Sequence, residues 1–290
     1  RGGDRSAARC GRSESRGLVE DGSVRDVTAA LDVLPSYRVP LPRFDPVIAA
    51  LPMLRPHILR AAEAATPVPL DAVRLLSPVA NPQKIVAAPV NYQAHRDEAA
   101  AEPGLHFGRT DHAIHTLGVF LKNPGSIVGA GEGVALRFPE RRNDHEIELV
   151  AIIGRETRHA TRETALDCVA GYCIGLDMTL RGPEERSLRK SVDTYTVLGP
   201  FLVTADELPD PSALALDLRV GNETRQHANT RDLIIDLPGL IELATRFYTL
   251  LPGDVLMTGT PEGVGPVKPG DTVVATIERI GAMSVPIRAA

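Results

Sequence analysis

The chain has 290 residues, enough for one large domain or for a core domain with a small appendage, which excludes a binding peptide or a disulfide mini-protein. Its composition, 43% hydrophobic and 24% charged, is typical of globular proteins, and the low aromatic content of 4% disfavours functions that need aromatic stacking. With 32 basic and 37 acidic residues the formal net charge is -5, so the chain has no general attraction to nucleic acid or to anionic membranes. We therefore expect a small-molecule substrate and neither a nucleic-acid nor a membrane partner.

The three cysteines Cys10, Cys168 and Cys173 are an odd number, which favours a reducing compartment over a disulfide framework. No stretch approaches the roughly 18 to 20 apolar residues that a membrane helix needs, and no secretory signal opens the chain. Residues 1–16 are polar and basic without apolar periodicity, and we expect them to form a disordered or truncated terminus. These features predict a cytoplasmic protein.

Residues 17–78 predict a small N-terminal domain that contains both helix and strand. Short β-prone runs on either side of Asp21-Gly22 predict a hairpin, because this dipeptide suits a tight turn. Apolar residues at spacings of three and four over residues 46–65 predict one or two helices. A proline follows Leu51, so we expect the first helix to end there.

Residues 79–290 predict a second domain that is mostly β and carries the chemistry. Short apolar runs separated by Gly, Pro, Asn and Asp predict strands within residues 84–90, 118–121, 146–153, 171–176 and 197–203. Helical spacing over residues 238–250 predicts one helix late among the strands. Because strands and helices do not alternate regularly, a doubly wound parallel sheet is disfavoured, and we predict an α+β fold with a mixed, curved sheet.

Paired carboxylates begin one of the predicted strands. Side chains alternate along a strand, so Glu146 and Glu148 share a face with the apolar residues that follow. Burying two carboxylates together requires a compensating cation, and we expect Asp177, at the end of a later apolar run, to supply a third oxygen ligand for Mg²⁺, Mn²⁺ or Ca²⁺. Two alternatives remain open: the glutamates are exposed and solvated, or Asp177 caps a turn through Thr179.

His95 and Glu98 follow an apolar run and are three residues apart, so on a helix they face the same side. A carboxylate that orients an imidazole makes a general base for water, although a surface ion pair has the same spacing. The polar segment 99–117 after this pair is a candidate lid. Two histidines in this segment, His112 and His115, fit solvated side chains better than metal ligands.

Cations and a glycine-rich loop complete the set of candidate groups. Arg181 and Lys190 lie near the acidic cluster in sequence, and an anionic substrate would explain cations beside a metal site, whereas surface solvation is the alternative for each. Residues 253–265 form a strand that runs into a loop in which Thr260 and backbone N–H groups can approach a carboxylate or a phosphate. The loop matches neither the phosphate-loop nor the dinucleotide-binding pattern.

In their order along the chain, these pieces resemble the fumarylacetoacetate hydrolase family from Lys84 to the C-terminus. The matching motifs are Asn91-Tyr92 with His95, Phe120-Leu121-Lys122, His145-Glu146-Ile147-Glu148-Leu149, Asp177-Met178-Thr179 with Arg181, Lys190-Ser191-Val192-Asp193, Gly199-Pro200 and the segment from Pro252 to Gly265. The resemblance implies a mixed β-roll catalytic domain, a homodimer, and Mg²⁺ or Mn²⁺ bound through Glu146, Glu148 and Asp177.

By the same resemblance, Arg181 and Lys190 would contact the oxygens of a 2-oxo acid, and Thr260 would hold its carboxylate. His95 and Glu98 would form the acid-base pair. The chain departs from the family at Glu184, where acylpyruvate-cleaving members often have an amide. An ionised carboxylate only accepts hydrogen bonds, so we expect Glu184 to face the far end of the substrate and to disfavour a second carboxylate directly against it.

These inferences predict a metal-dependent hydrolase that cleaves a C–C bond in an acylpyruvate or 1,3-diketo acid. The metal would chelate the 2-oxo acid and stabilise the enolate left after cleavage, His95 with Glu98 would deprotonate water, and Lys190 would offset charge in the transition state. One alternative is an isomerase or decarboxylase of 2-hydroxyhepta-2,4-diene-1,7-dioate-like compounds or 2-oxo diacids in aromatic breakdown. The alternative of another class is a catalytically silent dimer that binds a metal and a carboxylate.

Overall fold

The computed structural model describes residues 14–102 and 113–290, so part of the candidate lid and His112 lie outside the described residues. Contacts divide the chain into two units. The first comprises Arg1–Pro35 with Pro52–Val73, and the second comprises Ser36–Leu51 with Arg74–Ala290. The domain boundary expected at residues 78 and 79 stays a prediction.

The first unit contains the predicted hairpin. Strand β1 (Gly17–Glu20) pairs antiparallel with β2 (Ser23–Asp26), and the turn residues Asp21 and Gly22 both have positive φ, of 49° and 72°. Two such residues are characteristic of a type I′ turn, which matches the twist of paired strands. A short strand β3 (Val68–Pro69) pairs with β2, and the 3₁₀ helices η1 (Thr28–Val33) and η2 (Leu70–Ala72) complete the unit. The hairpin prediction is confirmed.

Helix α1 (Pro46–Ala64) does not end at Leu51, so that prediction is wrong. The helix continues through Pro52 and Pro56, which are both exposed and lie four residues apart on one face. Each proline removes one hydrogen bond of the helix, while Leu54 packs in full burial on the opposite face. The free energy gained by burying one face of α1 therefore outweighs the loss of the hydrogen bonds that the two prolines cannot donate.

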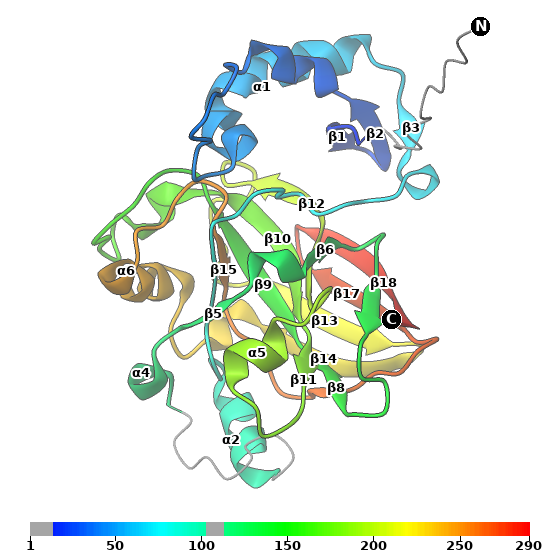
Figure 1. Cartoon of the computed structure of the whole chain (residues 1–290), viewed down its shortest axis with the longest axis vertical. Helices are drawn as coiled ribbons and strands as arrows, with labels where there is room; N and C mark the ends of the chain where they lie inside the picture. The colour runs from blue at the N-terminus through cyan, green and yellow to red at the C-terminus, as the bar shows by residue number, and fades with distance from the viewer. Residues whose placement is uncertain (1–13, 103–112) are drawn as a thin grey trace, which may run out of the picture. The chain divides into compact units, whose positions relative to one another are not determined.

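The second unit is built on a seven-stranded sheet with the order β5-β4-β15-β9-β10-β12-β6 (Figure 1). In chain order the strands are β4 (Ile85–Ala87), β5 (Phe120–Lys122), β6 (Ile127–Gly129), β9 (Ile147–Ile153), β10 (Val169–Asp177), β12 (Thr196–Thr204) and β15 (Val255–Met257). The pairs β12–β6 and β15–β4 are parallel and the others are antiparallel, so the predicted mixed sheet is confirmed. All five predicted apolar runs contribute strands to this sheet.

Two smaller sheets belong to the same unit. A five-stranded sheet comprises β14 (Glu223–Asn229), β13 (Ala215–Val220), β17 (Thr272–Ile277), β18 (Gly281–Ala289) and β7 (Val134–Leu136). A three-stranded sheet comprises β11 (Thr179–Leu180), β8 (Asn143–His145) and β16 (Gly265–Pro266). The helices are α2 (Gln93–Ala101), α4 (Ile114–Leu117), α5 (Arg186–Lys190) and α6 (Leu237–Phe247), with 3₁₀ helices η3 (Pro124–Ser126), η4 (Ala165–Cys168) and η5 (Thr230–Asp232). Helix α6 confirms the predicted late helix.

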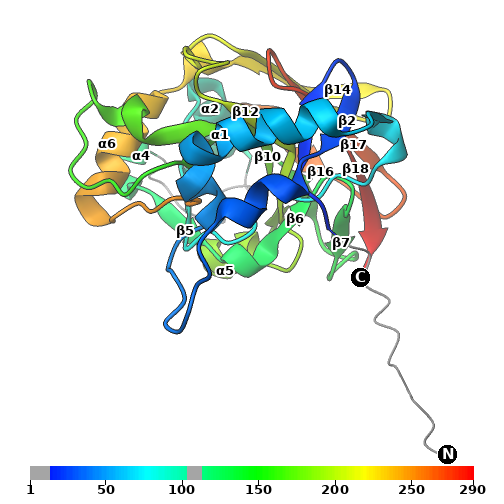
Figure 2. The same cartoon turned by 90° about the horizontal axis from the view of Figure 1, so that it is seen from above.

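Layers of this unit are arranged around the central strands. Figures 1 and 2 both show α6 on one side of β10 and the strands β17 and β18 on the other. Buried side chains from β9, β10, β13, β17 and α6 form one continuous core. No helix of the described residues is long and apolar enough to cross a membrane.

Strand β9 is buried on both faces. Leu149, Ala151 and Ile153 join the main core, whereas Val150 and Ile152 face a second apolar cluster. Both faces of such a strand must be apolar, and this explains the unbroken run that ends β9. Any carboxylate on this strand has therefore left bulk water.

Candidate metal and substrate site

Three carboxylates meet where β9 begins and β10 ends. The strands run antiparallel with Glu148 opposite Gly175, and the backbone N–H of Asp177 donates to the carbonyl of Glu146 at 2.9 Å. One carboxylate oxygen from each of Glu146, Glu148 and Asp177 lies within 4.8 Å of the others. The exposed fractions are 4%, 1% and 1%, so the solvated alternative for the glutamates is wrong.

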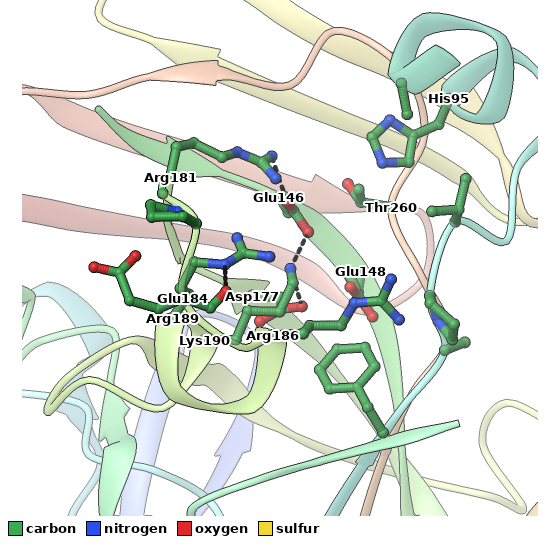
Figure 3. Close-up of a pocket in the computed structure, with 17 residues that line it drawn as sticks. His95, Glu146, Glu148, Asp177, Arg181, Glu184, Arg186, Arg189, Lys190 and Thr260 are labelled. Atoms are coloured by element: carbon green, nitrogen blue, oxygen red, sulfur yellow. Dashed lines mark hydrogen bonds and ion pairs between the residues drawn. The ribbon is translucent and has the colours of Figure 1, made fainter. Parts of the chain in front are cut away.

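Two lysines neutralise part of this cluster. Lys190 Nζ, at the end of α5, donates to Glu146 Oε2, Asp177 Oδ2 and Thr179 Oγ1, each at 2.7 Å (Figure 3). Lys122 Nζ, at the end of β5, donates to Asp177 Oδ1 at 2.5 Å. The Asp177 carboxylate thus binds two ammonium groups and does not cap a turn through Thr179, which contradicts that alternative.

The second carboxylate oxygen of Glu146 accepts a hydrogen bond from an arginine. Arg181 Nη2 donates to Glu146 Oε1 at 2.8 Å, and its Nε donates to Asp144 Oδ2 at 2.7 Å. Asp144 is fully buried and also accepts from Arg142 Nε at 2.8 Å. Arg142 in turn contacts Glu102, the residue that follows α2. Asp144 therefore acts as a positioning residue that fixes both guanidinium groups.

Among the three carboxylates, Glu146 and Asp177 accept hydrogen bonds from cationic side chains, whereas Glu148 has no such described hydrogen bond. Lys190 and Arg181 outweigh the effect of burial and hold the pKa of Glu146 below its usual range. Glu148 instead accepts from the backbone N–H of Gly259 at 2.7 Å, and burial together with the nearby Asp177 raises its pKa well above the usual range. A buried carboxylate of this kind is stable in its ionised form only beside another positive charge.

A divalent cation fits this arrangement. The three ligands offer only carboxylate oxygens, which suit Mg²⁺ or Mn²⁺ better than metals that prefer sulfur or imidazole. Among the described residues, five carboxylates (Glu102, Asp144, Glu146, Glu148 and Asp177) face four cations (Lys122, Arg142, Arg181 and Lys190). A divalent ion added to this set changes its formal charge from one negative to one positive, an excess that a chelating anion would offset.

His95 of the predicted acid-base pair lines the same pocket from α2. His95 Nδ1 lies 2.8 Å from Glu98 Oε2, and the other oxygen of Glu98 accepts from the backbone N–H of Gly263 at 3.0 Å. An ionised Glu98 can only accept, so Nδ1 carries the proton and Nε2 keeps its lone pair. His95 is 6% exposed, and the surface-pair alternative is therefore wrong. In the view of Figure 3 its ring lies on the same side of the glutamates as Thr260.

Thr260 is held by a residue from another sheet. Gln226 of β14 donates from Nε2 to Thr260 Oγ1 at 2.8 Å and to the carbonyl of Pro261 at 2.9 Å, while its Oε1 accepts from the backbone N–H of Ile147 at 3.1 Å. Because Oγ1 accepts from Gln226, the Thr260 hydroxyl proton can be donated into the pocket. Gly259, with φ of +95°, lets the loop pass close to Asn91, where a Cβ would lie 2.7 Å from Asn91 Cβ.

Glu184 lies on the pocket wall, but its carboxylate does not stand alone. Both of its oxygens accept from Arg141, at 2.9 Å and 2.8 Å, and this pairing lowers the pKa of Glu184. The arginine offsets the negative charge that we expected to repel a second substrate carboxylate. His115, by contrast, is exposed on α4 and is not among the pocket-lining residues.

Sequence reasoning missed several residues that support the site. Lys122 closes an apolar strand, a position at which an unexpected lysine is a usable signal of a buried ion pair. Asp144 lies two residues before Glu146, and the sequence pattern does not indicate that its carboxylate has a separate role. Gln226 lies in a strand with mixed polarity and gives no local signal, because its partners are 34 and 79 residues away. Such long-range pairing appears only in the folded chain.

Comparisons with known proteins agree with this geometry. Residues 84–288 match the family model described as fumarylacetoacetate (FAA) hydrolase C-terminal. A maleylpyruvate hydrolase from Aquipseudomonas alcaligenes is 54% identical over 282 residues, which cover 96% of this chain and 98% of the relative.

Two solved structures of relatives are similar to this chain in fold. The maleylpyruvate hydrolase from Sphingobium sp. SYK-6 in complex with manganese(II) and pyruvate has a TM-score of 0.79 and 38% identity, covering 94% of this chain and 96% of that chain. A 2-hydroxyhepta-2,4-diene-1,7-dioate isomerase from Mycobacterium marinum has a TM-score of 0.64 and 34% identity, covering 77% and 81% of the two chains. These neighbours confirm the expected α+β fold.

The raised pKa of Glu148 predicts that metal binding releases a proton. Below that pKa the carboxyl group of the metal-free protein is protonated, so Mn²⁺ must displace about one proton and its affinity rises with pH. Calorimetric titrations in buffers of different ionisation enthalpy measure this release. Glu148→Gln should abolish it and weaken binding roughly 100-fold, while Glu223→Gln, exposed on β14, should change neither quantity. Equal proton release and affinity in wild type and Glu148→Gln would contradict the assignment.

Proposed function

This chain belongs to the fumarylacetoacetate hydrolase family, as its motifs implied, and we propose that it is a metal-dependent hydrolase that cleaves the C–C bond of an acylpyruvate such as maleylpyruvate. The observation that carries the proposal is that the three-carboxylate cluster and His95, which Glu98 orients, line one pocket. The 54% identity to a maleylpyruvate hydrolase supports the substrate class.

Substrate binding follows from the charges around the cluster. An ion held by Glu146, Glu148 and Asp177 would chelate the 2-oxo acid and lower the energy of the enolate that cleavage produces. Lys190 is placed to offset negative charge on the same oxygens, since its ammonium already lies between two of the carboxylates. The Thr260 hydroxyl would donate to the substrate carboxylate. Arg181 keeps Glu146 ionised and contributes to the positive potential of the pocket.

The His95–Glu98 pair supplies the proton transfers. His95 Nε2 takes a proton from water, and the hydroxide adds to the acyl carbonyl carbon, C4 of the 2,4-dioxo acid. The bond between C3 and C4 then breaks, its electron pair passes to C3, and the proton carried by His95 returns to C3. The products are a carboxylic acid and pyruvate. Glu98, fixed by Gly263, holds the ring in the required tautomer and stabilises the imidazolium.

We further propose that the enzyme uses Mg²⁺ as well as Mn²⁺, forms a homodimer and acts in the cytoplasm. The family resemblance supports the metal and the dimer. The two described cysteines, Cys168 and Cys173, are buried free thiols, which supports a reducing compartment.

The substrate class is tested by turnover. Purified protein with Mn²⁺ should convert maleylpyruvate to maleate and equimolar pyruvate, measured with lactate dehydrogenase, and chelation of the metal should abolish the reaction. Consumption of 2-hydroxyhepta-2,4-diene-1,7-dioate without pyruvate formation, together with inactivity on maleylpyruvate, would instead assign the isomerase function. No turnover of either compound with metal bound would assign the silent binding protein.

The role of His95 is tested by truncation. His95→Ala should lower kcat roughly 100-fold because the general base is lost, whereas Mn²⁺ affinity should not change because the described hydrogen bond of the imidazole is to Glu98 and not to one of the three proposed ligands. His115→Ala, which removes an exposed imidazole from α4, is the matched control and should turn over normally. A His95→Ala enzyme with near-normal kcat would show that the pair does not act as the base.

A further inference from the structure

Gln226 is a buried polar side chain that the sequence motifs do not include and that the proposed chemistry does not use directly. It lies on β14, in a different sheet from the proposed metal ligands. The register of β13 with β14 shifts between the pairs Leu218–Gln226 and Arg219–Thr224, so Arg225 is an extra residue of β14. A β-bulge of this kind bends its strand and redirects side chains, and it is common beside active sites.

Backbone groups fix which way round the Gln226 amide lies. The backbone N–H of Ile147 can only donate, and it lies 3.1 Å from one end of the amide, which must therefore be the oxygen Oε1. The carbonyl of Pro261 can only accept, and it lies 2.9 Å from the other end, which must be the NH₂ group. His145 Nδ1 lies 3.1 Å from Oε1 and donates to it, because a carbonyl oxygen has no proton to give. These three neighbours prevent the amide from reversing.

The orientation of the amide decides the polarity of the Thr260 hydroxyl, which lines the pocket (Figure 3). Gln226 Nε2 directs one N–H to the Pro261 carbonyl and the other to Thr260 Oγ1 at 2.8 Å. Oγ1 is therefore an acceptor toward the protein, and its own proton must point away from Nε2. A ligand oxygen in the pocket thus meets a donor whose direction is set before binding.

We propose that Gln226 is a positioning residue that holds the Thr260 hydroxyl as a preformed donor for the carboxylate of the 2-oxo acid. The inference rests on the proposed function, in which Thr260 binds this carboxylate, and it assigns part of the affinity for the carboxylate to a residue behind Thr260. An ionised carboxylate only accepts hydrogen bonds, so it matches a fixed donor. Without Gln226 the hydroxyl is free to rotate, and the ligand must order it on binding.

A double-mutant cycle separates this role from a structural one, in which Gln226 only ties β9 to the loop after Thr260. Calorimetry measures the oxalate affinity of Mn²⁺-loaded wild type, Gln226→Met, Thr260→Val and the double variant. Thr260→Val should weaken oxalate binding roughly 10- to 100-fold, since a hydrogen bond to a charged group is lost, and Gln226→Met roughly 3- to 10-fold. In the Thr260→Val background Gln226→Met should change the affinity less than about twofold, because no hydroxyl is left to orient.

Further variants distinguish loss of the donor from damage to the site. Thr260→Ser keeps a hydroxyl, so its oxalate affinity should stay within about threefold of wild type, and Gln226→Met should weaken binding again in that background. Mn²⁺ affinity should be unchanged throughout, because neither side chain is a proposed metal ligand. With maleylpyruvate, Gln226→Met should raise KM by a factor similar to its loss of oxalate affinity and change kcat less than about threefold. Gln83→Met, exposed and away from the pocket lining, is the matched control and should behave as wild type.

A crystal structure of the wild type with Mn²⁺ and oxalate tests the contact without any substitution. Thr260 Oγ1 should lie within hydrogen-bond distance of both Gln226 Nε2 and an oxalate oxygen. Oxalate that does not contact Thr260, or an equal loss from Gln226→Met in the wild-type and Thr260→Val backgrounds, would overturn the role of Gln226 while the hydrolase function stands. A wild type that binds Mn²⁺ but releases no pyruvate from maleylpyruvate would overturn the hydrolase function, and the oxalate measurements would still decide the role of Gln226.

Discussion

Burial of three carboxylates at the end of two paired strands is the constraint on which the site depends. Glu146, Glu148 and Asp177 are almost inaccessible to water, and each must meet positive charge or lose its own. Lysine and arginine side chains reach Glu146 and Asp177, but Glu148 receives only a backbone N–H. The site is thus built to take a divalent cation, and the cations already present draw in an anion that can bind it.

The fold meets this constraint by converging many segments on one point. The pairing of β9 with β10 places Glu148 and Asp177 on neighbouring strands. The loop that follows β15 brings the backbone N–H of Gly259 to the carboxylate of Glu148. Cations arrive from the loop after β11 and from α5, which are neighbours in sequence, and from β5, which is distant from both. Helix α2 is joined to this centre twice, through Glu98 to Gly263 and through Glu102 to Arg142. These two contacts fix the position of His95, the proposed general base, relative to the proposed metal ligands.

Sequence patterns predicted the parts of the site that depend on local order. Alternation along a strand placed Glu148 on a buried face, and the three-residue spacing brought His95 to Glu98. The spacing of these residues did not exclude that Glu148 is exposed to solvent or that His95 and Glu98 form a surface ion pair. Burial in the folded chain decided against them, because the apolar residues that cover the site come from other strands.

The remaining features depend on contacts that no local pattern encodes. Lys122 is 55 residues from Asp177, and Asp144 binds Arg181 across 37 residues. The same limit explains the error at Leu51: Pro52 ordinarily ends a helix, but packing of Leu54 allows α1 to continue. Propensity and spacing describe single elements, whereas these features arise from the packing of several.

The central claim is that this pocket binds a 2-oxo acid only when a divalent cation completes the charge balance. Calorimetric titration of oxalate, which mimics the chelating end of the substrate, tests it directly when done with metal-free protein and with Mn²⁺-loaded protein. The account predicts measurable one-to-one binding to the Mn²⁺-loaded protein and none, or binding weaker by about 100-fold or more, without the metal. Equal oxalate affinity in both forms would contradict it.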